Sequence, residues 1–160
     1  MKAINYKRIG TIRTLFKEPR GTPIQPAAAK GVRGTVTVEG EYAEGLKDLE
    51  GFSHIILIYH FHLSEGYSLT VTPFMDDRPR GVFATRAPRR PNPIGISVVK
   101  LLGVEGSELE VENVDVVDGT PLLDIKPYVP QFDGRAGEEI GWLSGKAEEA
   151  SQVKADDRFK

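Results

Sequence analysis

Short apolar stretches separated by glycine and proline run through most of this chain, and several alternate apolar with polar positions. Residues 32–38 (VRGTVTV) alternate in this way, and residues 54–62 (HIILIYHFH) form a dense β-branched and aromatic run. Because such side chains pack well on a pleated surface, both stretches predict strands. The same reasoning predicts five more strands: Ser68–Thr72, Gly81–Thr85, Ile94–Leu102, Glu108–Val117 and Leu122–Val129.

The spacing of these strands indicates a mainly β, antiparallel fold. Many short strands with glycine or proline between them are typical of a barrel or a sandwich, and the pattern alone does not separate the two. The stretches Ile94–Leu102 and Glu108–Val117 are joined by GVEGS, which predicts a hairpin with a glycine-containing loop.

Helical patterns are few. Tyr42–Leu49 predicts one short helix, and Ser144–Asp156 predicts a C-terminal helix with Ser144 as its cap. Residues 14–30 contain three prolines and predict an ordered, lid-like loop. We expect a barrel domain over residues 1–137, a helical extension over residues 138–160, and fraying of the last ten residues.

Composition narrows the class of protein. A chain of 160 residues with 39% apolar and 28% charged residues is long enough for one domain with a real core. The absence of cysteine excludes disulfides and thiolate chemistry. The longest apolar run, Ile55–Tyr59, is too short to span a bilayer. These features predict a soluble cytoplasmic protein.

Five arginines lie between residues 78 and 90 with no acid among them, although the net charge of the chain is −2. Guanidinium groups recognise carboxylate and phosphate with two parallel hydrogen bonds. Pro88, Pro91 and Pro93 stiffen the same stretch, and a preorganised loop binds at a lower entropy cost. The pattern favours a site for an anionic ligand over a solvated basic loop.

The histidines and acids offer other chemistry. His54, His60 and His62 would share one face of a continuous strand, but three ligands on one strand do not surround a metal ion. We interpret them as core or rim residues and predict no metal site. A metal-dependent enzyme remains an alternative that rests on them alone.

Three aspartates surround a DGTP turn. Asp118 opens the turn, where its side chain can bond the backbone, while Asp115 precedes it on a predicted strand and is placed to face a ligand. Asp124 follows the turn. The chain has neither the GxxxxGK[ST] phosphate loop nor the GxGxxG dinucleotide fingerprint, which argues against P-loop hydrolases and Rossmann dehydrogenases.

Four segments together resemble the TsaA-like family, which includes SAM-dependent tRNA N6-adenosine methyltransferases. They are RIGTIRTLFKEPRGTPIQP (8–26), GLKDLEGFSHIILIYHFH (45–62), GVFATRAPRRPNPIGIS (81–97) and VDVVDGTPLLDIKPYVP (114–130). The resemblance covers about residues 4–133 and implies a small β-barrel. It also implies a homodimer that binds S-adenosylmethionine (SAM) near its interface and methylates N6 of t6A at tRNA position 37.

The resemblance carries a set of cofactor-binding residues onto this chain: Gln25, Pro26, Ala27, Ala28, Ser64, Glu65, Arg86, Ile96, Asn113, Val114 and Asp115. In this setting we expect Arg86 to hold the cofactor carboxylate, and the Ile96 and Val114 backbones to hold its adenine ring. We expect Arg80, Arg89 and Arg90 to contact tRNA phosphates. Asp118 and Asp124 are the candidate catalytic carboxylates that take the departing proton.

Larger family members carry an additional small C-terminal domain thought to help hold tRNA, and no counterpart is recognisable here. Two functions therefore stay open. The first is a SAM-dependent tRNA methyltransferase, and the second is a non-catalytic module that binds SAM or a nucleotide.

Overall fold

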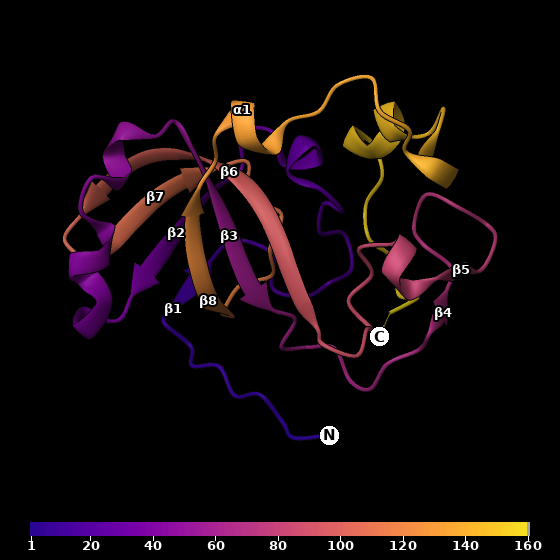
Figure 1. The fold of residues 1–160 in the computed structure, drawn as a ribbon, viewed down its shortest axis with the longest axis horizontal. Helices are drawn as coiled ribbons and strands as arrows, with labels where there is room; N and C mark the ends of the chain where they lie inside the picture. The colour runs from indigo at the N-terminus through magenta and orange to yellow at the C-terminus, as the bar shows by residue number, and fades with distance from the viewer. Residues whose placement is uncertain (160) are drawn as a thin grey trace.

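Alternating buried and exposed positions close six antiparallel strands into a barrel (Figure 1). The computed structural model describes residues 1–159. The strands follow one another around the barrel in the order β1-β2-β7-β6-β3-β8, and β8 pairs with β1 to close it. Their bounds are β1 Gly10–Arg13, β2 Arg33–Val38, β3 His54–His60, β6 Ile94–Glu105, β7 Glu108–Glu112 and β8 Thr120–Pro127. The mainly β barrel expected from the resemblance is thus confirmed.

The barrel interior is filled by every second side chain, as the pleat of a strand requires. On β3, Ile55, Leu57 and Tyr59 are buried, while the residues between them are only half-buried. On β6, Val99 faces the same core and has no exposed surface. The strand predicted at residues 54–62 is therefore correct in type, but it ends at His60.

The predicted hairpin between β6 and β7 is present, with Glu105 opposite Glu108. Gly106 makes the turn with a φ of 61°, a left-handed conformation that glycine adopts without strain. The prediction that the second strand runs to Val117 is wrong. β7 ends at Glu112 because Asn113 turns left-handed, with a φ of 66°, and its Oδ1 accepts a hydrogen bond of 2.9 Å from the Gly31 backbone.

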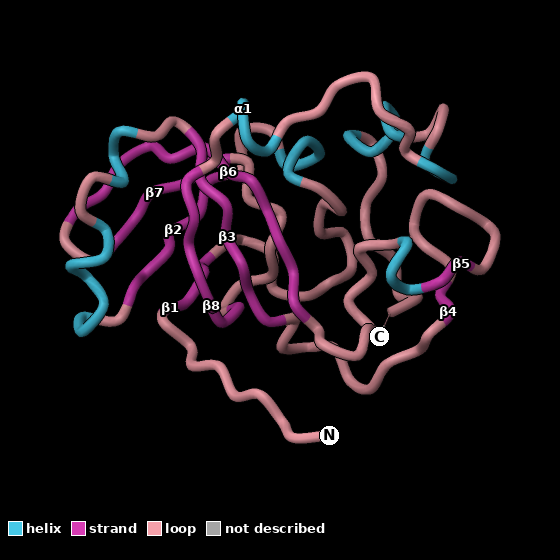
Figure 2. Tube along the Cα trace, in the orientation of Figure 1, coloured by secondary structure: helices cyan, strands magenta, loops and turns pink. Residues whose placement is uncertain are grey.

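Residues 61–93 form a second, loop-rich half beside the barrel, on the right in Figure 2. It contains a two-stranded sheet of β4 (Thr70–Val71) and β5 (Arg80–Gly81). The strand predicted at Gly81–Thr85 is wrong beyond Gly81, because residues 82–84 turn into a 3₁₀ helix that packs Val82 inward. A small core of Val71, Val82 and Ala87 supports this half.

The helices are all short, and one prediction among them fails. The predicted helix Tyr42–Leu49 is a 3₁₀ helix that ends at Leu46. The predicted C-terminal helix Ser144–Asp156 is wrong, because Gly145 is left-handed and only Ala147–Ser151 is helical. The helices are η1 Pro26–Ala29, η2 Gly40–Leu46, η3 Leu49–Gly51, η4 Val82–Ala84, α1 Pro130–Asp133, η5 Gly141–Leu143 and η6 Ala147–Ser151. No helix within residues 1–159 is long and apolar enough to cross a membrane.

Residues 152–159, called here the C-terminal segment, contact the rest of the chain, although the sequence predicts that the last ten residues fray; residue 160 lies outside the described residues. The C-terminal segment returns to residues 21–23, where the Ala155 amide donates to the Thr22 carbonyl at 2.9 Å. Lys154 and Pro23 form an isolated antiparallel β-bridge. Arg158 Nη1 donates to the Pro73 carbonyl at 2.7 Å, and the rings of Phe159 and Phe74 meet edge to face. The segment therefore joins the predicted lid-like loop to the loop-rich half.

Candidate functional site

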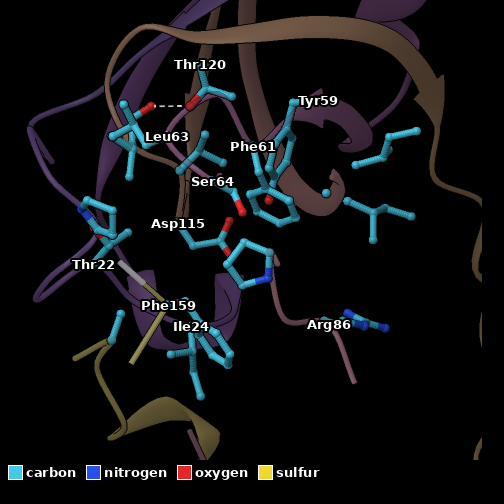
Figure 3. A pocket seen from close by; sticks show the side chains of 18 of the residues that line it. Thr22, Ile24, Tyr59, Phe61, Leu63, Ser64, Arg86, Asp115, Thr120 and Phe159 are labelled. Carbon is cyan, nitrogen blue, oxygen red and sulfur yellow. Dashed lines mark hydrogen bonds between the residues drawn. The ribbon is translucent and has the colours of Figure 1, made fainter. Parts of the chain in front are cut away.

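A cavity of about 440 Å³ lies where the barrel meets the loop-rich half (Figure 3). Its volume falls within the range of about 300–1,000 Å³ that is usual for small-molecule and cofactor sites. The wall is mostly apolar and comes from segments far apart in the sequence: it draws on residues 19–25, 59–64, 85–96, 115–117 and the C-terminal segment, together with Phe74 and Thr120.

A chain of buried hydrogen bonds forms the polar side of the cavity. Ser97 Oγ donates to Asp115 Oδ1 at 2.6 Å, and the Tyr59 hydroxyl lies 2.8 Å from Ser97 Oγ. Since the Ser97 proton is directed at Asp115, the Tyr59 hydroxyl is the donor to Ser97. β3 supplies Tyr59, β6 supplies Ser97, and the loop after Asn113 supplies Asp115.

Burial changes the ionisation of this chain. Desolvation raises the pKa of Asp115 to about 6, although the hydrogen bond from Ser97 and the charge of Arg86 favour the carboxylate form. Burial, followed by the nearby Asp115 charge, raises the pKa of Tyr59, so its hydroxyl stays protonated near neutral pH. The pKa of Asp115 thus lies close to neutral pH, where a carboxyl group can both accept and release a proton.

Arg86 stands at the rim of the cavity. Its Nη1 donates to Gln25 Oε1 at 3.0 Å, and the rest of the side chain is exposed. In Figure 3 the Asp115 and Ser64 oxygens lie near the centre of the view, whereas Arg86 lies apart from them at the lower right. The Ser64 hydroxyl oxygen is buried and has no hydrogen-bond partner among residues 1–159. A buried hydroxyl without a partner is a place where a ligand would be bonded.

The structure brings together some of the cofactor-binding residues that the resemblance implies. Gln25, Ser64, Arg86, Ile96 and Asp115 all line the cavity. Pro26 and Ala27 instead line a neighbouring hollow of about 390 Å³, which Gln25, Arg86 and Ile96 share. The cofactor prediction is thus consistent with the geometry at the residues that meet here.

The other predicted cofactor residues do not reach the cavity of this chain. Val114 is fully buried in the barrel core, and Asn113 is engaged with Gly31. Ala28 bonds Gln25 through its backbone and lies outside the wall, as does the exposed Glu65. Ala28 and Asn113 therefore shape the loops that carry the site, rather than its surface.

Neither predicted catalytic aspartate lies in the cavity wall. Asp118 accepts hydrogen bonds of 2.9 Å from Lys17 Nζ and from the Thr14 amide, which lower its pKa. Asp124 pairs with Lys126 at 2.9 Å and accepts from the Ile125 amide. Both carboxylates hold local backbone and charge in this chain, and their catalytic role stays a prediction.

The three arginines predicted to bind nucleic acid have different surroundings. Arg80 pairs with Asp76 at 2.7 Å and lies over the ring of Trp142. Arg90 Nη1 donates to the Thr85 and Ala87 carbonyls at 2.9 and 3.2 Å. Arg89 is half-buried and its Nε has no partner among residues 1–159. Contact with tRNA stays a prediction for all three, and Arg89 is the one without an internal role.

The three histidines lie in different surroundings and do not form a cluster. His62 lines the cavity, with Nδ1 3.4 Å from the Thr120 hydroxyl oxygen, and burial followed by the charge of His60 lowers its pKa. His54 Nδ1 lies 3.0 Å from the Ser53 hydroxyl, and its ring meets the ring of Tyr128 edge to face. Over residues 1–159, no group of three His, Asp or Glu side chains is placed to hold a metal ion.

Sequence reasoning missed Tyr59, Asp156 and Phe159 of the cavity wall, among others, and Ser97 beside it. Tyr59 and Ser97 could have been found from strand parity, because each points inward between core residues of its strand. Their meeting also depends on the β3–β6 register, which pairs Leu57 with Ser97. Asp156 and Phe159 gave no such sign, since the sequence predicts helix and fraying where the chain returns to the cavity.

A closed antiparallel barrel whose apolar cavity is lined by an arginine side chain and a half-buried carboxylate is typical of a small-molecule-binding β-barrel protein. Comparison with known proteins makes this specific. A profile of the tRNA-methyltransferase O N-terminal domain matches residues 11–134, and the chain belongs to this family.

Relatives of the chain include proteins with two kinds of name. A "probable S-adenosyl-L-methionine-binding protein" of Pyrococcus abyssi is 56% identical over 156 residues, which cover 98% of this chain and 85% of that protein. The tRNA (adenine(37)-N6)-methyltransferase of Escherichia coli K12 is 39% identical over 140 residues, covering 81% of this chain and 60% of that enzyme.

A solved structure agrees with the fold. The crystal structure of TrmO from Pseudomonas aeruginosa matches with a TM-score of 0.74 and 40% identity, covering 88% of this chain and 63% of that one. This chain therefore spans slightly less than two thirds of that structure's length.

Proposed function

We propose that this protein is a SAM-dependent methyltransferase that acts on N6 of t6A at position 37 of tRNA, as the name of its E. coli relative suggests for adenine 37. The proposal depends on the cavity, whose apolar wall combines the Arg86 guanidinium at the rim, the half-buried Asp115 carboxylate and the buried Ser64 hydroxyl without a partner among residues 1–159. SAM is the methyl donor and is consumed as a substrate.

The chemistry of the wall fits SAM. Its amino-acid end carries a carboxylate, which the exposed Arg86 at the rim suits because a guanidinium binds carboxylate with two parallel hydrogen bonds. Its adenine ring needs apolar faces and hydrogen bonds, which Ile96 and the unpaired Ser64 hydroxyl offer at the wall. Its sulfonium is a cation and favours the side of the cavity where Asp115 lies.

The acceptor must reach the cavity with its N6 in line with the transferred methyl group. Positioning of this kind supplies a large part of the acceleration of bimolecular reactions, about 7–11 kcal/mol in well-oriented cases. The rigid Pro88–Pro93 stretch forms part of the wall and carries Arg86, Arg89 and Arg90 on or beside it. We propose that this stretch positions both the methyl donor and the nucleic acid.

Two measurements test the proposal. Calorimetry should show SAM binding, and absence of binding at millimolar SAM would contradict it. Transfer of a labelled methyl group should occur to tRNA that carries t6A and fail with the same tRNA bearing unmodified adenosine at position 37. Methylation of both tRNAs would keep the reaction and reject t6A as its substrate.

The alternative is a SAM-binding module without catalysis, which the name of the P. abyssi relative favours. Tight SAM binding with no methyl transfer to either tRNA would support this alternative. The homodimer implied by the resemblance stays a proposal, with the outer face of β6 as its interface, where Ile94 and Ile96 are 40% and 47% exposed. Sedimentation of the protein tests the dimer.

A further inference from the structure

Asp115 is the only acid of the cavity wall that is held from inside the barrel. Its Oδ1 accepts from Ser97, which in turn accepts from Tyr59, and all three residues line or border the cavity. Asp156, the other acid of the wall, is exposed and paired with Arg158 at 2.8 Å. Ser97 is 2% exposed, so water does not compete for its hydrogen bond.

We propose that Asp115 is the catalytic proton acceptor of the methyl transfer, and that Ser97 and Tyr59 are positioning residues that fix its carboxylate. This inference rests on the proposed function. The N6–CH3 bond forms as the S–CH3 bond breaks and its electron pair returns to sulfur. The proton leaves N6 for Asp115, whose second oxygen is not engaged by a side chain among residues 1–159. Water then takes the proton away.

The ionisation of Asp115 suits this role. A general base works best when its pKa lies near the working pH, because it is then both ionised and reasonably basic. Burial raises the pKa of Asp115 to about 6, so at pH 7 it is mainly the carboxylate and a stronger base than an exposed aspartate. The pKa values of Asp118 and His62 are instead lowered from their usual values.

The charged and titratable groups around Asp115 come from every element of the wall. Tyr59 from β3 stays neutral, and Arg86 from the proline-rich stretch favours the carboxylate form. The remaining groups are engaged elsewhere: Arg90 with backbone carbonyls, His62 close to Thr120, and Asp156 with Arg158.

The first experiment compares wild-type protein with Asp115→Asn in single turnover at saturating SAM and t6A-bearing tRNA. The rate should fall by about 100-fold to 10,000-fold, because a general base contributes about that much. The wild-type rate should rise with pH and then level off, following the ionisation of Asp115 in the complex. Asp48→Asn is the matched control, since Asp48 is exposed and outside the cavity wall.

Ser97→Ala tests the positioning role. Because the Ser97 hydrogen bond favours the carboxylate, its loss should raise the pKa of Asp115 and move the rise of the pH–rate profile to higher pH. A carbon-13 NMR titration of the Asp115 carboxyl, without tRNA or SAM, should show the same upward shift independently of activity. Ser53→Ala is the control, because Ser53 is exposed and lies outside the cavity wall.

Stability gives a further readout that needs no substrate. A folded-state pKa of about 6, raised from 3.8, means that the folded protein gains protons relative to the unfolded chain in this window. The wild type should therefore lose stability, relative to Asp115→Asn, as pH rises from about 4 to about 6. Over this pH range the unfolding equilibrium constant of the wild type should rise by about 100-fold relative to that of Asp115→Asn.

Three outcomes overturn the assignment. The first is an Asp115→Asn rate within threefold of wild type. The second is a loss of SAM affinity with an unchanged rate at saturation, which would make Asp115 a cofactor ligand only. The third is a loss of rate in His62→Gln while Asp115→Asn stays active. If the wild type methylates no tRNA, the proposed function fails, and the inference falls with it.

Discussion

Arg86 and Asp115 bring a cation and a carboxylate to one cavity by different means. Arg86 is exposed at the rim and is held by one hydrogen bond to Gln25, so its charge costs little to maintain. Asp115 is sunk in the wall, and ionising it costs enough to raise its pKa. At the scale of the residue, the rim charge is suited to binding and the buried charge to chemistry.

Replacement of Arg86 tests the binding role. Arg86→Ala should weaken SAM binding by about tenfold to 100-fold, because a hydrogen bond to a charged group contributes about 1.5–3 kcal/mol. Arg86→Lys should recover part of the loss, since lysine keeps the charge and loses the fork. Calorimetry measures the affinities, with the exposed Arg33→Ala on β2 as control. An unchanged affinity in Arg86→Ala would place the carboxylate elsewhere.

Gly95 tests how tightly the aromatic wall is packed. It lies opposite Tyr59 on β6, and a Cβ at this position would collide with the rings of Tyr59 and Phe61. Gly95→Ala should lower the free energy of unfolding by about 1–3 kcal/mol, as overpacking does. It should also weaken SAM binding by displacing Tyr59 from Ser97.

Denaturant unfolding and calorimetry measure the two effects of Gly95→Ala. Gly103→Ala on the same strand is the control, because nothing lies within 4 Å of a Cβ there. Equal free energies of unfolding for the two variants would show that Tyr59 and Phe61 move aside without loss of stability.

At the scale of the element, the C-terminal segment completes the cavity without belonging to the barrel. It contributes Ala155, Asp156 and Phe159 to the wall, although none of the six barrel strands pairs with it. Its attachment depends on backbone bonds to residues 21–23 and on the contacts of Arg158 and Phe159 with the loop-rich half. Loss of these contacts should therefore change ligand binding before it changes the barrel.

Ala155→Pro tests this separation. Proline removes the amide that donates to the Thr22 carbonyl at 2.9 Å, so the segment should detach from residues 21–23. We expect SAM affinity to fall by about tenfold, because one hydrogen bond and part of the cavity wall are lost. The thermal unfolding temperature of the barrel should change little. Hydrogen exchange over residues 152–159 and calorimetry measure the effect.

Ala147→Pro is the matched control for Ala155→Pro. Ala147 opens a 3₁₀ helix, where proline is tolerated, and it lies outside the cavity wall. An equal loss of SAM affinity in both variants would contradict a specific role for the C-terminal segment.

At the scale of the whole molecule, the charge of the arginine-rich stretch is smaller than the sequence suggests. The net charge is −2, and the charge of Arg80 is met by Asp76, which is also paired with Lys146. Burial opposes the ionisation of Asp76, but the hydrogen bonds from Arg80 and Lys146 outweigh it and lower its pKa. We therefore expect tRNA binding to depend on a few unpaired arginines and not on a general positive field.

The salt dependence of tRNA binding separates these arginines. Arg89→Ala should weaken binding and reduce the slope of log affinity against log salt by about 1, as expected for one lost phosphate contact. Arg80→Ala should reduce the slope less than Arg89→Ala does, because its charge is already paired with Asp76. Fluorescence anisotropy at several salt concentrations measures both. Equal slopes for wild type and Arg89→Ala would exclude Arg89 as a phosphate ligand.

The parts of the fold that depend on local pattern were predictable from the sequence. The strand at residues 54–62 was found because its β-branched and aromatic residues favour a buried sheet. β1 was missed, since four residues carry too short a pattern. The C-terminal helix was wrong because contacts with residues 21–23 and 73–76, distant in sequence, decide that segment.

Some residues of the candidate site were predictable from the sequence, but the contacts between them were not. Arg86 and Asp115 were found because the resemblance and their charge both single them out. The link of Asp115 to Ser97 and Tyr59 was not predictable, because it depends on the register of two strands and on the left-handed Asn113 that ends β7. Asp118 lies outside the cavity wall and its catalytic role stays a prediction, because a turn aspartate and a catalytic one look alike in sequence.

The pairing of residues 21–23 with residues 154–155 also sets the order in which the protein becomes competent. The two parts of this wall leave the ribosome more than a hundred residues apart. All six barrel strands are synthesised before residue 128, and domains fold from the N-terminus during synthesis. The barrel strands are therefore complete in the growing chain before the residues that finish the wall of the SAM cavity are made.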